Sequence, residues 1–325
     1  MSKILELEEL DVNLYRSKYL RKPVHARGVF GGHVVGQALV SATKTVSPEY
    51  KVHSLHSHFL LAGDNTVPII YEVQRVRDGR SFATRVVLAK QHGRGIFTCT
   101  ISFQRPEKSR LVHQYVMPDV PQPESIPSWG EVYSKAKDMQ DLPDRFREYL
   151  ALRYEEPLLI DVRRVSNMDP KDMVEPKALP PRQLMWMRAT ERLNGDPSIH
   201  HCVLAYCTDH EFLDTSVLPH AVSAYSPDRQ LNMIVSLDHT IWFHADFRAD
   251  DWLLYEMESP YAGGGRGLSF GRVYTRDGLL VASIAQEGVI RANISGPSDE
   301  KLFVSAPITE YTPAVIPDRR RAAKL

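Results

Sequence analysis

The chain has 325 residues, of which 43% are hydrophobic, so two domains of roughly 150 residues can each bury a core. Forty basic residues balance forty acidic ones, which excludes a general electrostatic attraction to nucleic acid or to an anionic membrane. Three cysteines without a CxxC pair argue against a disulfide framework or a zinc cluster, and no apolar run approaches eighteen residues, so an intracellular protein without a membrane span is expected.

The first predicted helix lies in "FGGHVVGQALVSATKTVSPEY", where apolar positions recur at helical spacing before Pro48 stops the helix. These positions are Val35, Leu39, Ala42 and Val46. The segment also carries three glycines, which lower helix propensity and usually allow close approach to another backbone. They are Gly31, Gly32 and Gly36. We therefore expect a buried helix that packs closely against a second backbone segment.

Four strand-like segments follow the helix, separated by Gly, Asp or Pro turn signals. They read "VHSLHSHFLL", "VPIIYEVQRVRDG", "SFATRVVLAKQHG" and "GIFTCTISFQ". This order predicts a meander of long antiparallel strands. From about residue 106 the strand pattern is lost, and a proline-rich stretch precedes two short, charged helices separated at Pro143. We interpret this stretch as a linker and covering insert.

The second half repeats the same order of elements. A strand-like "LMWMRATERL" precedes a second predicted helix, with Asp196 as its cap, Pro197 at its first position and Pro219 as its stop. Four more strand-like segments follow, from "LNMIVSLDHTIWF" to "LLVASIAQEGVIR". The second half therefore also predicts a buried helix followed by a meander.

A short phrase is repeated in the two strand sets. "SLHSHFLL" begins at Ser54 and "SLDHTIWF" at Ser236, and a glutamine, Gln104 or Gln286, lies fifty residues after each serine. Self-similarity at a long fixed offset indicates a duplicated structural unit. We expect an α+β architecture in which a long helix wrapped by a curled antiparallel sheet occurs twice. The expected boundaries are residues 1–110 for the N-terminal repeat, 111–157 for the linker and helical insert, 158–308 for the C-terminal repeat, and 309–325 for the tail.

One carboxylate distinguishes the two predicted helices. The first helix has no acidic residue from Gly31 to Val46, whereas the second contains Asp209, three positions after Tyr206 and seven after Cys202, on the apolar stripe. A buried aspartate usually has a hydrogen-bond partner or a function. The alternative is a solvated residue near the helix C-terminus.

Two strand residues could join Asp209. Ser236 opens the first long strand of the second sheet and Gln286 lies in the last, and strands of a curled sheet that are distant in sequence can become neighbours. Because no histidine base accompanies the serine, an acyl-enzyme of the serine-protease type is not expected. The set suits a water molecule that the carboxylate deprotonates. The alternative is that Ser236 and Gln286 only satisfy backbone groups.

Two further motifs have a weaker functional interpretation. His53, His56 and His58 alternate along a strand, but no acidic or cysteine partner lies at ligand spacing, so cross-strand packing is expected rather than a metal site. The segment "GGGRG" resembles a phosphate-binding loop without the strand-to-helix context of one. Gly265 and Arg266 could hold a phosphate of a substrate there, and the alternative is a flexible hairpin.

Five motifs in the same order resemble the acyl-CoA thioesterase II family: "RGVFGGHVVGQAL", "VHSLHSHFLLAGD", "RDGRSF", "LDHTIWFH" and "VASIAQEGVIR". The resemblance implies a double hot-dog fold, hydrolysis of fatty acyl-CoA to free fatty acid and CoA, no metal or cofactor, and assembly into a homodimer or homotetramer. It also implies that Asp209, Ser236 and Gln286 are the catalytic residues. Because only the second helix carries a carboxylate, we expect one active site per chain, with Ser54 and Gln104 as a non-catalytic counterpart.

Two rival functions remain open. One is a non-catalytic acyl-CoA binding protein on a degenerate hot-dog scaffold, against which the three retained residues argue. The other is a hot-dog 2-enoyl-CoA hydratase, which resembles a different motif, an aspartate and a histidine close together on the first helix turn. That motif is not found in this sequence.

The final residues suggest a location. Ala323, Lys324 and Leu325 keep the small, basic, leucine pattern of the C-terminal peroxisomal address. Pro313 and Pro317 indicate an extended, accessible tail before it. We expect recognition by a peroxisomal import receptor and a place in the peroxisomal matrix. The alternative is a disordered basic tail without an address.

Overall fold

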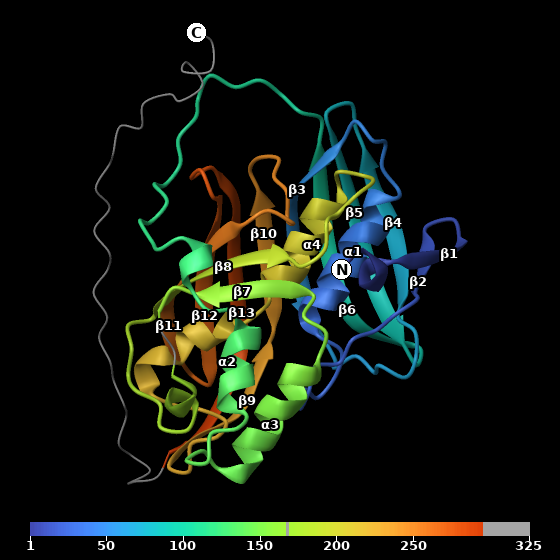
Figure 1. Ribbon diagram of the computed structural model, residues 1–325. Coiled ribbons are helices and arrows are strands. Elements are labelled where there is room, and N and C mark those ends of the chain that lie inside the picture. Colours follow the sequence, from blue (N-terminus) through green and yellow to red (C-terminus); the bar gives the residue numbers. More distant parts are fainter. Residues whose placement is uncertain (167–168, 295–325) are drawn as a thin grey trace.

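The computed structural model describes residues 1–166 and 169–294, and it contains two similar sets of strands and helices (Figure 1). The first set consists of β1 (Leu7–Asp11), β2 (Leu14–Ser17), α1 (Gly31–Thr43), β3 (Lys51–Phe59), β4 (Ile70–Asp78), β5 (Phe82–Gln91) and β6 (Arg94–Gln104). The second consists of β7 (Ile160–Arg164), β8 (Arg182–Ala189), α4 (Ile199–Cys207), β9 (Arg229–Ser236), β10 (Asp238–Phe243), β11 (Leu253–Gly263), β12 (Arg266–Thr275) and β13 (Leu280–Ile294).

The strands form one antiparallel sheet with mirrored halves. The order is β1-β2-β4-β5-β6-β3 and then β10-β13-β12-β11-β8-β7, so that β3 and β10 pair at the centre, while β9 pairs with β13 outside this path. The strand order of the second half therefore repeats that of the first in reverse. The predicted α+β double hot-dog fold is confirmed.

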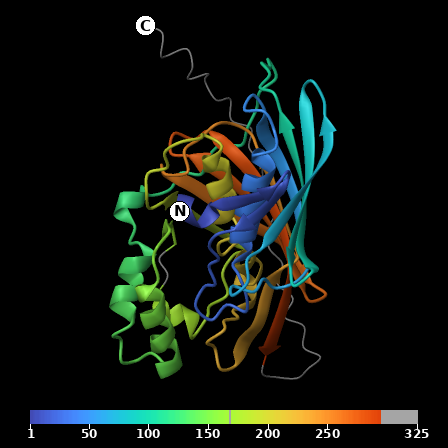
Figure 2. The ribbon, with the colours of Figure 1, turned by 90° about the vertical axis from the view of Figure 1, so that its right-hand side faces the viewer.

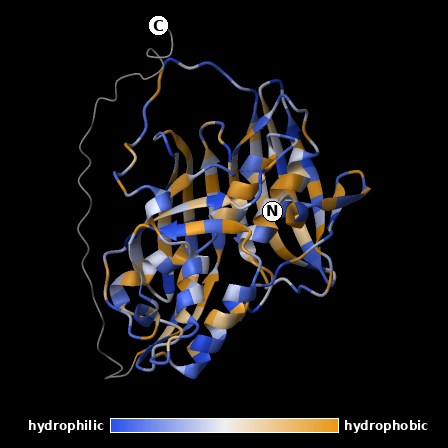
Figure 3. Ribbon diagram, in the orientation of Figure 1, coloured by the Kyte–Doolittle hydropathy of each residue, from blue (hydrophilic) through white to orange (hydrophobic). Residues whose placement is uncertain are grey.

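Alternating side chains build the core of the sheet. In β5, buried residues alternate with partly or fully exposed ones along the strand, and Figure 3 shows the corresponding alternation of hydrophobic and hydrophilic residues along the strands. This period of two places one set of side chains against α1 and α4. None of the helices within the described ranges is both long and apolar enough to cross a membrane.

The two central helices pack at backbone distance, as the glycines predict. A Cβ atom added at Gly32 would lie 2.3 Å from the carbonyl oxygen of Tyr206, and one at Gly36 would lie 3.0 Å from that of Cys202. Both carbonyls belong to α4. Glycine at these positions removes the side chain that would otherwise hold α1 and α4 apart.

The second helix is shorter than predicted. It begins at Ile199 and ends at Cys207, after which the chain turns and continues in the 3₁₀ helices η4 (Leu213–Ser216) and η5 (Leu218–His220). The turn includes Glu211, whose φ of 56° is incompatible with a continuous right-handed helix. The helix also starts two residues later than predicted, with Ser198 instead of Asp196 at its N-cap. The Asp196 carboxylate accepts a hydrogen bond from the amide of Ser198 at 2.9 Å, before the helix begins.

The insert forms two helices on either side of Pro143, as predicted. They are α2 (Trp129–Ala136) and α3 (Asp144–Glu155), and α2 starts with a capping box made by Ser128 and Glu131. Two further 3₁₀ helices, η2 (Pro123–Ser125) and η3 (Pro170–Met173), flank this region, and η1 (Ser2–Leu5) opens the chain. Figure 2 shows α2 and α3 on the side of the molecule opposite strands β4 to β6.

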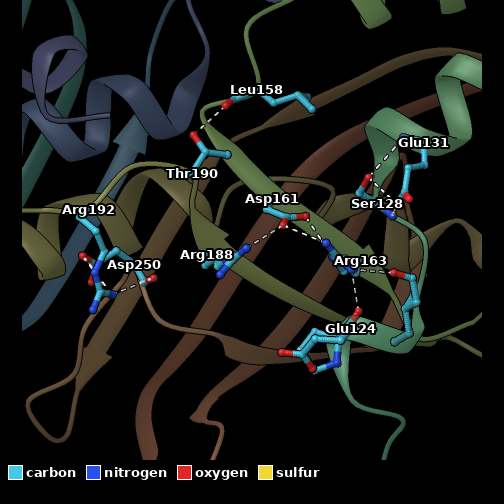
Figure 4. Close-up of polar contacts among 12 residues, drawn as sticks. Glu124, Ser128, Glu131, Leu158, Asp161, Arg163, Arg188, Thr190, Arg192 and Asp250 are labelled. Carbon is cyan, nitrogen blue, oxygen red and sulfur yellow. Dashed lines mark hydrogen bonds and ion pairs between the residues drawn. The ribbon is translucent and has the colours of Figure 1, made fainter.

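Polar contacts attach the insert to the outer strand β7. The Arg163 guanidinium donates to the carbonyl oxygens of Pro123 and Ile126 at 2.9 and 3.0 Å (Figure 4). Asp161 lies between Arg163 and Arg188, with ion-pair distances of 3.2 and 3.5 Å. The linker is therefore fixed to the edge of the second half of the sheet.

Candidate functional site

A cavity of about 640 Å³ lies between the two halves and receives side chains from both. The first half contributes the loop before α1, residues 25–30, and the end of β3 with the turn that follows, residues 59–63. The second half contributes residues 211–214 and 231–237, together with Asp209 and Gln286. A site in this cavity consequently requires both repeats, even though its carboxylate comes from only one.

Asp209 lies in the turn that follows α4, two residues beyond the last helical residue. Its Oδ2 atom accepts a hydrogen bond of 2.7 Å from the backbone amide of Gly32, in the first turn of α1. The first amides of a helix have no carbonyl partner within the helix and favour negative charge. Asp209 is thus a partly buried, bonded carboxylate rather than a solvated one, and α1 of the first half fixes its position.

Ser236 and Gln286 converge on the other carboxylate oxygen. The Gln286 amide nitrogen donates to Asp209 Oδ1 at 2.8 Å and to Ser236 Oγ at 2.6 Å. The Ser236 hydroxyl donates to Asp209 Oδ1 at 3.3 Å. The structure therefore brings all three predicted residues into one hydrogen-bonded group, on the wall of the cavity.

The strand that carries Ser236 differs from the prediction. The single strand expected across "LNMIVSLDHTIWF" is interrupted at Leu237, so that Ser236 closes β9 instead of opening a strand. The amide of Leu237 donates to the carbonyl oxygen of Glu287 at 2.9 Å. The interruption lets β9 and β10 pair with different parts of β13, which places Ser236 opposite Gly288, two residues from Gln286.

The first-half pair does not reproduce this geometry. In the first half, Ser54 pairs with Ser102, and Gln104 lies two residues after Ser102. In the second half, Ser236 pairs with Gly288, and Gln286 lies two residues before Gly288. A register shift between Val52 and Ser54 accompanies the difference. The fifty-residue spacing is therefore equal in the two halves without placing the two glutamines alike.

Two residues behind the site were not predicted as functional. His239, on β10, is fully buried, and its Nδ1 lies 2.7 Å from Gln286 Oε1. Its Nε2 lies 3.1 Å from the hydroxyl of Thr208, the residue before Asp209. The sequence signal was the first histidine of "LDHTIWFH", but only the register of β10 against β13 places it next to Gln286.

The other proposed motifs lie elsewhere. Gly265 lies in the two-residue turn between β11 and β12, and Arg266 begins β12 and makes an ion pair of 2.8 Å with Glu287. Taken over the described residues, the lining of the cavity includes neither of them. His53 bonds to the Ser102 hydroxyl at 2.8 Å, and His56 packs edge-on against Trp242, which are cross-strand contacts. Within residues 1–166 and 169–294, no group of three or more His, Cys, Asp or Glu side chains could hold a metal ion.

Charged groups continue around the wall of the cavity beyond the three residues. Burial would raise the pKa of Glu211, but Arg164, at 2.7 Å, and His210 together hold it well below its ordinary value. Burial and the charge of Glu211 raise the pKa of Asp214. Glu211 and Asp214 also line a second cavity of about 310 Å³ under α2 and α3.

Comparison with known proteins gives consistent matches along the chain. The profile described as acyl-CoA thioesterase matches residues 163–289, and that of the acyl-CoA thioesterase N-terminal domain matches residues 20–104. Acyl-coenzyme A thioesterase 8 of Mus musculus is 44% identical over 292 residues, which cover 90% of this chain and 88% of the mouse protein. Peroxisomal acyl-coenzyme A thioester hydrolase 1 of Saccharomyces cerevisiae is 28% identical over 331 positions, covering 89% of this chain and 94% of the yeast protein.

A solved structure agrees with these matches. The acyl-CoA thioesterase II TesB2 from Mycobacterium marinum superposes with a TM-score of 0.68 at 40% identity, covering 92% of this chain and 99% of the mycobacterial one. The similarity therefore spans both repeats and the segment between them.

Proposed function

The chain belongs to the acyl-CoA thioesterase II family, a family of thioester hydrolases, and we propose that it hydrolyses fatty acyl-CoA to free fatty acid and CoA with a water molecule activated by Asp209. One observation carries this proposal. The Asp209 carboxylate lies within 2.8 Å of the Gln286 amide and 3.3 Å of the Ser236 hydroxyl, at the wall of a cavity large enough for a substrate chain.

The proposed reaction is a direct attack by water on the thioester. A water molecule that donates to Asp209 and accepts from the Gln286 amide or the Ser236 hydroxyl would replace one of the hydrogen bonds that these groups make with one another. As the water oxygen bonds to the carbonyl carbon, its proton passes to the Asp209 carboxylate. The carbon–sulfur bond then breaks as the oxyanion re-forms the carbonyl, and the CoA thiolate takes up the proton held by Asp209, which restores the carboxylate. Ser236 serves to position the water and forms no acyl-enzyme.

The N-terminus of α1 is suited to stabilise the developing negative charge on the carbonyl oxygen. Gly31 lines the cavity beside Asp209, and the first amides of a helix point toward such charge without needing to reorganise. The amide of Gly32 already binds the carboxylate at 2.7 Å. In this arrangement α1 contributes to two steps, since it holds the base and stabilises the oxyanion.

Release of free thiol from a series of acyl-CoA substrates, from C2 to C20, tests the activity and defines the preferred chain length. Turnover above the rate of spontaneous hydrolysis is expected for at least one chain length. Binding without thiol release would favour the acyl-CoA binding protein. Hydration of a 2-enoyl-CoA without thiol release would favour the hydratase.

We further propose that the protein works in the peroxisomal matrix, where such an enzyme would release CoA beside β-oxidation. The support is the sequence Ala323-Lys324-Leu325, which lies outside the described residues, together with the peroxisomal name of the yeast relative. Import of an N-terminally tagged chain by the peroxisomal receptor should require Leu325. Equal distributions of the intact chain and of one lacking Leu325 would reject this address.

Assembly into a homodimer or homotetramer remains a prediction from the family resemblance. Sedimentation analysis of the purified chain at several concentrations would measure it directly. The proposed role of Gly265 and Arg266 in holding a substrate phosphate also remains open, and a KM unchanged by Arg266→Ala would reject it.

A further inference from the structure

The amide of Gln286 can perform its proposed role in only one orientation. Its nitrogen faces Asp209 Oδ1 at 2.8 Å and Ser236 Oγ at 2.6 Å, and its oxygen faces the His239 ring at 2.7 Å. A rotation by 180° would bring the amide oxygen against the carboxylate oxygen, two acceptors without a proton between them. Some group must therefore hold the amide oxygen on the far side from the site.

His239 is placed to be that group. β10 and β13 pair with Thr240 opposite Ala285, which sets His239 beside Gln286 on adjacent strands. The histidine is 0% exposed and Gln286 only 1% exposed, so water does not compete for the amide oxygen. On the other side of the ring, Nε2 lies 3.1 Å from the hydroxyl of Thr208.

The direction of every bond follows from the carboxylate. Asp209 only accepts, so the Gln286 nitrogen must face it and the Gln286 oxygen must face His239. His239 Nδ1 must then carry a proton. Burial lowers the pKa of His239, which favours the neutral ring and leaves Nε2 as an acceptor for the Thr208 hydroxyl. The Thr208 hydroxyl has one proton, and His239 Nε2 at 3.1 Å is a nearer acceptor than the Ala205 carbonyl oxygen at 3.4 Å. The chain of donors thus runs from Thr208 to His239, to Gln286 and on to Asp209.

We propose that His239 and Thr208 are positioning residues that lock the Gln286 amide with its nitrogen toward Asp209 and Ser236. The inference rests on the proposed function, because it assigns a task to the residues that hold the water. Neither residue lines the cavity, so both act through Gln286 and neither contacts the substrate. Thr208 immediately precedes Asp209 in the chain, and it therefore also links the turn that carries the base to the orientation of the amide.

Two substitutions separate the hydrogen bond from packing. In His239→Asn, the side-chain amide nitrogen can take the place of Nδ1 and still donate to Gln286, whereas His239→Leu retains apolar volume and removes the donor. We expect the Leu variant to lose kcat by on the order of 10- to 100-fold with little change in KM, the size of effect that a misplaced catalytic group produces. The Asn variant should retain most of the activity, within about 5-fold of wild type.

A matched control comes from the same half of the molecule. His201, in α4, is 8% exposed and packs edge-on against Phe243 and Phe247. His201→Leu should lower the melting temperature about as much as His239→Leu and leave kcat within about 3-fold of wild type. Equal losses of kcat in His201→Leu and His239→Leu would show that a buried histidine matters only for stability, and would overturn the proposal.

A double-mutant cycle tests whether His239 acts through Gln286. In a Gln286→Ala background, His239→Leu should lower kcat by less than about 3-fold further, because the group that it positions is already absent. A further loss as large as in the wild-type background would refute the positioning role. A stable fold of each variant is verified by its thermal unfolding transition.

The protonation of His239 gives a readout that is independent of activity. In protein labelled with ¹⁵N-histidine, the resonances missing from His239→Asn identify the residue, and they should report a neutral ring with the proton on Nδ1 at pH 7.5. A proton on Nε2 would overturn the inference even if the enzyme is active. Conversely, if Asp209→Asn leaves the rate of thiol release unchanged while His239 has the expected tautomer, the proposed function fails and the hydrogen-bond chain stands.

Discussion

Replacing Gly32 with alanine tests how closely α1 and α4 must approach to hold the site. The new Cβ atom would lie 2.3 Å from the carbonyl oxygen of Tyr206 and 3.1 Å from the Cβ atom of Asp209. Ordinary contact begins near 3.4 Å, and the Tyr206 carbonyl is backbone, so the two helices must separate locally by the difference of about 1.1 Å.

This separation should affect both stability and catalysis. Overpacking should lower the free energy of unfolding by about 1–3 kcal/mol. The better helix propensity of alanine offsets up to about 1 kcal/mol of this loss. The hydrogen bond from the Gly32 amide to Asp209, now 2.7 Å, would lengthen to roughly 3.8 Å, beyond bonding distance. Because a displacement of about 1 Å can cost on the order of 100-fold in rate, kcat should fall by about 10- to 100-fold.

Gly36→Ala is the matched control in the same helix. Its Cβ atom would meet the flexible end of the Leu5 side chain at 2.9 Å and the Cys202 carbonyl at 3.0 Å, which requires a shift of only a few tenths of an ångström. Stability should change by less than about 1 kcal/mol and kcat by less than about 3-fold. Urea unfolding and thiol release measure the two quantities. Wild-type kcat in Gly32→Ala, or equal losses in both variants, would refute the reasoning.

Further predictions concern the single site and the buried histidines. Ser236→Ala should lower kcat by about 10-fold or more, because a hydrogen-bond partner of the attacking water is lost. Gln104→Ala should leave kcat within about 3-fold of wild type. A loss of thiol release in Gln104→Ala as large as in Ser236→Ala would contradict a single site. Burial lowers the pKa of His33 and of His201 to about 4, from 6.5. Between these values the unfolded chain binds more protons than the folded one. The titration of each histidine therefore costs no stability above pH 6.5, and the cost grows as the pH falls, reaching on the order of 3 kcal/mol below pH 4. In urea unfolding between pH 4 and 7, His201→Leu should show a shallower dependence on pH than wild type, and an identical dependence would count against this assignment.

The glycines of the first predicted helix allowed the close contact between the two central helices to be predicted from the sequence. Glycine in a helix is costly, and three in one predicted helix indicated a neighbouring backbone, which α4 provides. The length of α4 was overestimated because apolar residues continue past Cys207 at helical spacing. Phe212, Leu213 and Val217 are buried in or beside a 3₁₀ helix, after the chain has changed direction at Glu211. The apolar residues of a 3₁₀ helix recur about every three positions, which resembles the spacing of an α-helix in the sequence.

The edge strands and the second layer of the site depend on tertiary pairing. β1 and β7 are short outer strands, and β1 reads "LEELD", which is too charged to indicate a strand by composition. The three candidate residues could be proposed from one carboxylate and a repeated phrase. His239 could not, because its role follows from the register of β10 against β13 and from the break at Leu237, neither of which is encoded in local spacing.

The most direct measurement is the rate of thiol release by Asp209→Asn, with the substrate that wild type hydrolyses best. The substitution keeps size and shape while removing the base, so kcat should fall by about 100-fold or more, with KM changed little and the thermal unfolding transition close to that of wild type. Turnover by Asp209→Asn equal to that of wild type would contradict water activation by Asp209, and with it the account of this site.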